Sequence, residues 1–275
     1  MPIGIDIVEP PMLAAAQAAE GITVRDGQRI MLNAREVKSI DEIMLLNTAC
    51  AQVDGAYSAD RGEAQAGHPR EPARGGGHQQ LDLQARSTST TSTRCRVSAA
   101  LPTRTCSATG LHLGPGDRAL LRHHPDVRGL QDLLLPTFVV GKASDAQRDA
   151  YKQAREHRQG YRADGPGQDD RQGRVGVAQG DRLRLLLGDG GAFGLQFGHS
   201  VGLFLHRAAE YVSRLNSIEH PEEIKEGMVI ALETYCPAKD GISAARIEEE
   251  VVVTAHGPQA ITRSSSAELF VANAY

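Results

Sequence analysis

The sequence contains no tryptophan, and aromatic residues make up only 4% of its 275 residues. Its formal net charge of -4 excludes the strongly basic balance that attracts nucleic acid through the overall field of a protein. No stretch approaches the ~20 apolar residues of a membrane-spanning helix, and the N-terminus lacks the basic and apolar segments of a secretory signal. We therefore expect neither nucleic acid nor a membrane as a partner.

The four cysteines also lack any recognisable framework. Cys50, Cys95, Cys106 and Cys236 form no CxxC pair and have no zinc-like spacing. Thiols that are neither paired nor metal-bound fit a reducing compartment. The sequence thus predicts a cytoplasmic location.

The N-terminal residues 1–57 have well-formed local patterns. Thr23-Val24 and the apolar residues 30–32 flank the turn signal Asp26-Gly27, which is typical of strands on either side of a turn. This region is expected to form an entry segment that leads into a first helix.

The first helix is predicted from about residue 40 to residue 56. Ser39 followed three residues later by Glu42 forms a capping box. Ile43, Leu46 and Cys50 are spaced as one apolar face of a helix. We expect this face to pack against the core.

Two internal segments, residues 58–136 and 158–190, lose this organisation. Glycine, proline, arginine, histidine, serine and threonine dominate there, and the first segment includes the run RSTSTTSTRCRV. Such long segments without a periodic apolar pattern are uncommon inside a compact domain, so we expect both to be poorly ordered. Residues 137–157, where Ser144 caps an amphipathic helix, and residues 191–275 are again well patterned.

Polar residues with metal-binding chemistry lie within the apolar strands expected after residue 198. His199 and His206 flank alternating apolar residues, and Glu233 and Glu248 each lie in an apolar run. A buried carboxylate is costly unless it is paired, protonated or bound to metal. Taken singly, each residue could be a satisfied strand-end histidine or a solvated glutamate. Together they indicate a shared site for manganese, cobalt, zinc or iron.

The stretches GHSVGLFLH, EEIKEGMVIALETY and ARIEEEVVVTAHGPQAIT resemble the C-terminal half of the creatinase, aminopeptidase P and methionine aminopeptidase superfamily. The resemblance implies an α+β pita-bread fold, in which helices back a curved antiparallel sheet. It implies that His199, Glu233 and Glu248 are metal ligands and that His206 and Arg246 are catalytic. It also implies a homodimer and hydrolysis of Xaa-Pro peptides or of small amide, amidine or related nitrogen compounds.

One departure from the family pattern leaves alternatives open. Arg207 follows His206, where the peptidases of the family usually carry an acid, so the motif is closer to creatinase, which works without metal. The first alternative is therefore a metal-independent hydrolase with His206 and Glu233 as acid, base or substrate anchors. The second is a pseudoenzyme that only binds peptides or partner proteins.

A second departure concerns the first half of the family's site, which has two aspartate ligands eleven residues apart before an Arg-Thr step. Here that place reads LLRHHPDVRGLQDLLLPTFVVG, and Asp117, Asp126 and Asp132 do not have that spacing. Back-translation in a shifted frame gives TGPFFDIIQTYGAYKTCYYR, which restores the first aspartate and the Arg-Thr step but has cysteine at the second position. The sequence thus predicts a frameshifted middle, an incomplete fold and an inactive chain that binds metal weakly.

Overall fold

The computed structural model describes residues 1–6, 8–63, 93–95, 118–122, 126–127, 130–131, 137–163, 198–203, 224–241, 243–263 and 268–272. The described residues do not include His206, Arg207, residues 164–197 or most of residues 64–136. The structure therefore does not test the predictions made for them.

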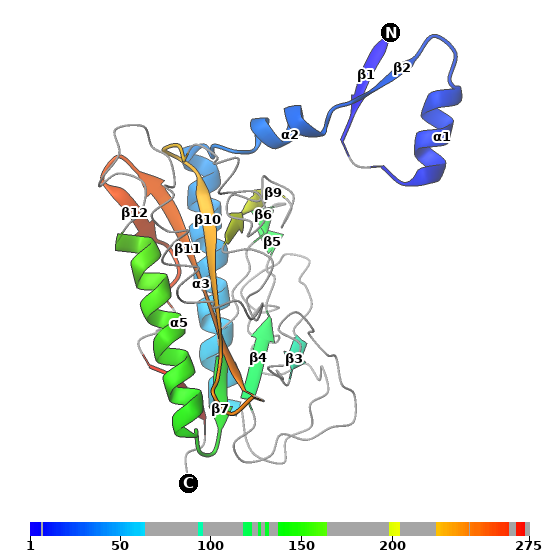
Figure 1. The fold of residues 1–275 in the computed structure, drawn as a ribbon. Helices are drawn as coiled ribbons and strands as arrows, with labels where there is room; N and C mark the ends of the chain where they lie inside the picture. The colour runs from blue at the N-terminus through cyan, green and yellow to red at the C-terminus, as the bar shows by residue number, and fades with distance from the viewer. Residues whose placement is uncertain are drawn as a thin grey trace.

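The N-terminal residues form a small unit that Figure 1 shows set apart from the other described elements. It contains β1 (Pro2–Ile5), α1 (Pro10–Ala18) and β2 (Thr23–Asp26), and β1 pairs with β2 in parallel. The short helix α2 (Gln28–Ala34) leads from this unit to the rest of the chain.

The prediction of a second strand after the Asp26-Gly27 turn signal is wrong, because residues 30–32 lie within α2. The side chain of Asp26 accepts a hydrogen bond from the backbone N–H of Gln28 at 2.9 Å. The backbone N–H of Met31 donates to the carbonyl of Gly27 at 3.1 Å. The aspartate therefore satisfies an N–H group at a helix start, and the chain continues as a helix.

Two long helices, α3 (Ile40–Glu63) and α5 (Asp145–Ala163), begin where their capping residues predict. The backbone N–H of Ser39 donates to Glu42 Oε2 at 2.8 Å, and the N–H of Glu42 donates back to Ser39 Oγ at 3.3 Å. Ser144 and Gln147 make the same reciprocal pair before α5, at 2.9 and 3.2 Å. Both boxes satisfy N–H groups that a helix start leaves unpaired.

The remaining elements are strands arranged in three sheets. The first has the order β12-β11-β10-β8, the second β13-β7-β4-β3, and the third β5-β6-β9. The short strands β3 to β6 lie within residues 58–136, where the sequence has no persistent apolar periodicity. The strands are β3 (Thr93–Cys95), β4 (Arg118–Arg122), β5 (Asp126–Val127), β6 (Leu130–Gln131), β7 (Thr137–Val140), β8 (Gly198–Ser200), β9 (Gly202–Leu203), β10 (Val229–Pro237), β11 (Ala244–Thr254), β12 (Gly257–Ala260) and β13 (Phe270–Ala272).

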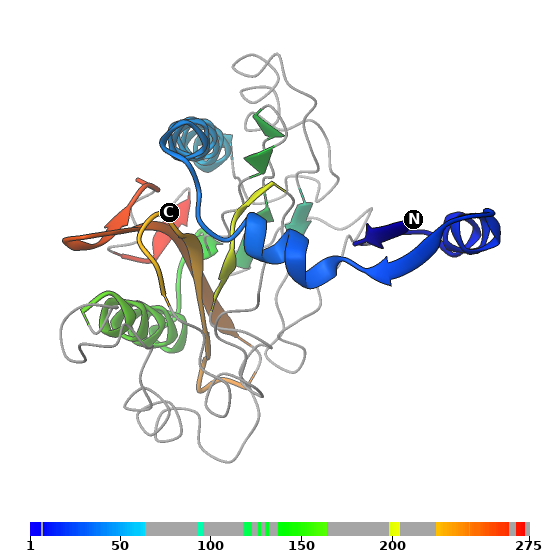
Figure 2. The same ribbon diagram turned by 90° about the horizontal axis from the view of Figure 1, so that it is seen from above.

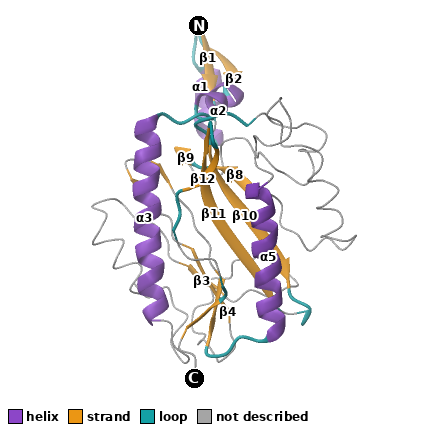
Figure 3. Cartoon of the chain, turned by 90° about the vertical axis from the view of Figure 1, so that its left-hand side faces the viewer, coloured by secondary structure: helices purple, strands orange, loops and turns teal. Residues whose placement is uncertain are grey.

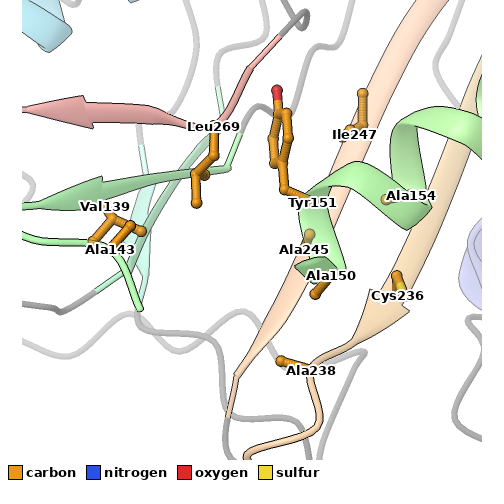
Figure 4. Packing of buried hydrophobic residues seen from close by; sticks show 10 residues of the cluster. All are labelled: Val139, Ala143, Ala150, Tyr151, Ala154, Cys236, Ala238, Ala245, Ile247 and Leu269. Atoms are coloured by element: carbon orange, nitrogen blue, oxygen red, sulfur yellow. The ribbon is translucent and has the colours of Figure 1, made fainter. Parts of the chain in front are cut away.

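The long strands β10 and β11 lie between α3 and α5, which cover opposite faces of their sheet (Figures 2 and 3). Tyr151 of α5 packs with Cys236 of β10 and Ile247 of β11, in the cluster of buried side chains that Figure 4 shows. On the other face, Leu46 of α3 belongs to a buried cluster with Val229. Alternate residues of each strand therefore face different helices, as the period of two requires.

The architecture confirms the predicted α+β class, with antiparallel pairing throughout the sheet that contains β10 and β11. In the described part of the chain, no helix combines the length and the apolar character needed to cross a membrane.

Candidate metal centre

Strand register places three chemically active side chains on one face of the β10–β11 sheet. His199 of β8 lies opposite Ala231 of β10, and Glu233 lies opposite Glu248 of β11. Ala231 and Glu233 are two residues apart, so their side chains point to the same face. His199, Glu233 and Glu248 therefore share that face, although they come from three strands.

The three side chains meet closely at their tips. His199 Nε2 lies 3.3 Å from Glu233 Oε1 and 3.6 Å from Glu248 Oε1. One ligand atom from each residue lies within 4.8 Å of the other two, and all three residues are buried. The structure thus brings together the three residues that the sequence singled out as ligands.

A glycine before His199 makes this approach of the strands possible. A Cβ atom at Gly198 would lie only 2.6 Å from the carbonyl oxygen of Ala231. A side chain there would therefore push β8 away from β10 and move His199 away from the two glutamates. This is the physical reason for the Gly-His pair in the sequence.

Two buried carboxylates directly opposite each other repel, and neighbouring cations offset this repulsion. Although burial alone lowers the pKa of His199, its close contacts with the carboxylates of Glu233 and Glu248 raise that pKa to about 10. Burial alone would raise the pKa of Glu233, but the close contact with His199 and the charge of Arg246 lower it to about 2. Burial and repulsion from Glu233 raise the pKa of Glu248 to about 7.

The donor set fits a divalent metal ion. Imidazole and carboxylate ligands suit manganese, cobalt, zinc and iron. Glu248 Oε2 is buried and accepts no hydrogen bond from any described part of the chain. A cation between the two glutamates would supply that oxygen with a partner and neutralise the repulsion. His199, Glu233 and Glu248 are the residues that could hold it.

Arg246, which the resemblance implies to be catalytic, lies beside this group. Its Nη2 atom donates to Glu233 Oε2 at 2.5 Å. Arg246 and Glu248 are two residues apart on β11, so they share the face of the sheet that carries the site. The arginine therefore holds one oxygen of Glu233 and leaves Oε1 directed at His199.

The remaining predicted site residue, His206, lies outside the described residues, and the three aspartates of the preceding half were not predicted to be ligands. Asp126 begins β5, but its side chain, like Asp117 and Asp132 as a whole, lies outside the described residues. Sequence reasoning missed two residues that lie near the site, Lys38 and Ser200, whose side chains bond at 2.7 Å. They are 162 positions apart, so no local pattern could have paired them.

Comparison with known proteins supports the resemblance. A model of metallopeptidase family M24 matches residues 35–255. No curated protein sequence matches this chain. Among solved structures, the fold is similar to an Xaa-Pro dipeptidase from Bacillus anthracis, with 22% identity, a TM-score of 0.73, and coverage of 96% of this chain and 72% of that protein.

One archaeal and one bacterial structure are also similar in fold. For a prolidase from Pyrococcus furiosus, the identity is 20% and the TM-score 0.75, covering 96% of this chain and 76% of the prolidase. For an X-Pro aminopeptidase from Thermotoga maritima, the identity is 15% and the TM-score 0.75. The match covers 95% of this chain and 71% of the aminopeptidase. These likenesses, with the antiparallel sheet, confirm the pita-bread fold. Because the family model covers most of its length, the chain belongs to metallopeptidase family M24.

Proposed function

We propose that this chain carries the metal site of an Xaa-Pro peptidase-type hydrolase, reduced to three ligands that bind one divalent ion. The observation that carries the proposal is the buried convergence of His199, Glu233 and Glu248, whose ligand atoms lie within 4.8 Å of one another. The solved structures that share the fold include an Xaa-Pro dipeptidase, a prolidase and an X-Pro aminopeptidase. Xaa-Pro peptides are therefore the first substrates to test.

The residues of the chain would divide the work as follows. A bound divalent ion would act as a Lewis acid and lower the pKa of a water molecule toward ~7. His199 directs Nε2 at the glutamates because its Nδ1 atom lies 3.0 Å from the carbonyl oxygen of Ser200. Arg246 fixes the carboxylate of Glu233. By resemblance, His206 would contact the substrate and bind or protonate the tetrahedral intermediate.

The same proposal holds that turnover by this chain is absent. The family resemblance calls for two aspartate ligands, and the segment in their place contains no pair at the required spacing. We propose that a frameshift replaced that strand, and that the metal site is therefore half-built. This also keeps open the second candidate function, a pseudoenzyme that binds peptides or partner proteins without hydrolysing them.

Two further parts of the proposal are a cytoplasmic location and a homodimer. Cys50 and Cys236 are buried thiols that are not joined in a disulfide, which suits a reducing compartment. The homodimer is carried over from the family resemblance alone.

Metal stoichiometry is the first test of the proposed function. Calorimetric titration of the metal-free chain with cobalt or manganese, combined with elemental analysis, should give at most one weakly bound ion per chain. Hydrolysis of an Ala-Pro or Met-Pro dipeptide should stay at the background rate, because a three-ligand site lacks the aspartates of the dinuclear centre.

A chain rebuilt in the shifted frame is the matched comparison for this test. It restores one aspartate and should bind metal more tightly than the chain described here. Tight binding of two ions by the present 275-residue chain, or measurable Xaa-Pro hydrolysis by it, would contradict the half-built site.

A further inference from the structure

A buried lysine lies behind the metal centre, in the segment that precedes α3. Lys38 is 6% exposed. Its Nζ atom donates to Ser200 Oγ at 2.7 Å and to the carbonyl oxygen of Glu36 at 3.1 Å. A buried ammonium group is unfavourable unless it is well paired, so a lysine placed here needs a compensating role.

Ser200 connects this lysine to the candidate ligand His199. Its hydroxyl accepts the hydrogen bond from Lys38, and its carbonyl oxygen lies 3.0 Å from His199 Nδ1. A hydrogen bond to one ring nitrogen fixes the orientation of a histidine and leaves the other nitrogen for a metal. Lys38 therefore contacts the same residue whose carbonyl oxygen lies beside the histidine ring.

Two glycines make room for this lysine segment. Gly202 has φ +151°, and a Cβ atom there would lie 3.0 Å from Lys38 Cε. Gly227 has φ +86°, and a Cβ atom there would lie 2.9 Å from Val37 Cγ1. The backbone N–H of Lys38 also donates to the carbonyl of Gly227 at 2.9 Å. The lysine is thus seated between the end of β8 and the start of β10.

We propose that Lys38 is a positioning residue that holds Ser200, and through it the ring of His199, in the geometry needed to bind a metal ion. This inference rests on the proposed function, because it assigns His199 to a metal site. A hydrolytic Ser–Lys pair does not fit these residues, because Ser200 is 1% exposed and a substrate could not reach its hydroxyl.

Lys38→Met tests the proposal because it keeps most of the side-chain length but removes the charged donor. We expect its affinity for cobalt to fall by about 10- to 100-fold, the effect usual for partners of metal ligands, and the visible spectrum of bound cobalt to change. Ser200→Ala should give a similar loss, and the double variant should lose little more, because both residues act along one path. Lys152→Met is the matched control, since that lysine side chain is 74% exposed.

Folding is measured on the same samples by circular dichroism and thermal unfolding. A purely structural role for Lys38 would lower thermal stability while the folded fraction kept its cobalt affinity and spectrum, and this result would overturn the proposal. If Lys38→Met does not fold, the cobalt affinity of Ser200→Ala decides instead, and an unchanged value overturns the proposal.

A second readout separates this proposal from the proposed function. In the metal-free protein, nitrogen-15 NMR with labelled histidine should show a slowly exchanging Nδ1–H of His199, assigned by its absence in His199→Gln. That signal should persist in Lys152→Met and exchange rapidly in Lys38→Met or Ser200→Ala. If the parent chain binds no cobalt, the proposed function fails, whereas the NMR signal still supports or overturns the role of Lys38.

Discussion

Glu248→Gln should abolish saturable cobalt binding by the chain. The substitution replaces a carboxylate of the proposed three-ligand group with a neutral amide of the same size, and Glu248 lies 3.6 Å from His199 Nε2 in the buried site. Loss of a direct ligand should exceed the roughly 10- to 100-fold cost of losing a partner of a ligand. Isothermal titration with cobalt measures the change.

The control for this variant is Glu249→Gln, one position along the same strand. Glu249 lies opposite Leu232 on β10, so its side chain points to the other face of the sheet. We expect it to leave cobalt affinity unchanged. Equal losses in the two variants would mean that the effect comes from the negative charge of β11 in general rather than from a ligand.

Leu46→Ala should lower the free energy of unfolding by about 2–5 kcal/mol, the range found for deleting a buried leucine side chain in a packed core. Leu46 is 0% exposed. It joins Val201, Val229 and Val252 in the cluster between α3 and the site face of the sheet. The cavity left there would also loosen the support beneath the candidate metal site. Reversible urea unfolding followed by circular dichroism measures the change.

Met44→Ala on the same helix is the matched control. Met44 is 63% exposed, so its removal should change the free energy of unfolding by less than about 0.5 kcal/mol. If Leu46→Ala cost no more than Met44→Ala, the packing of α3 against the site face would be wrong.

The sequence predicted the parts of the fold that short-range chemistry controls. The capping box of Ser39 and Glu42 and the capping serine at 144 marked the starts of α3 and α5, because helix caps depend on residues only a few positions apart. The glutamates at 233 and 248 were placed in strands because apolar residues surround them. These signals need no knowledge of distant segments.

The sequence failed where two local structures compete or where distant segments meet. The Asp26-Gly27 signal suits either a tight turn or a helix start, and the contact of Asp26 with the N–H of Gln28 favours the helix. The Lys38–Ser200 contact joins the segment before α3 to β8, 162 positions away, and has no sequence signal of its own. Polar residues within apolar strands indicated that His199 and the two glutamates share a site, but not which residues lie opposite each other, because strand register depends on the whole sheet.

Residues 58–136 and 158–190 are predicted to be poorly ordered from what their sequence lacks, rather than from a positive signal. Their expected disorder follows from low apolar periodicity, since a segment that buries little surface cannot offset ~1–2 kcal/mol of backbone entropy per residue. Hydrogen exchange across the run RSTSTTSTRCRV tests the expected disorder. A DNA read of the locus tests the proposed frameshift. Strand β3 (Thr93–Cys95), paired with β4, lies within that run.

Anomalous diffraction from crystals soaked in zinc tests the central claim, that His199, Glu233 and Glu248 form a metal site, most directly. We expect one zinc peak about 2.0–2.2 Å from His199 Nε2 and from an oxygen of each glutamate, the distances usual for zinc with these ligands. If the zinc peaks lay only at other residues, and His199 still contacted both glutamates with no ion between them, the three residues would form a buried ion-pair network rather than a metal centre.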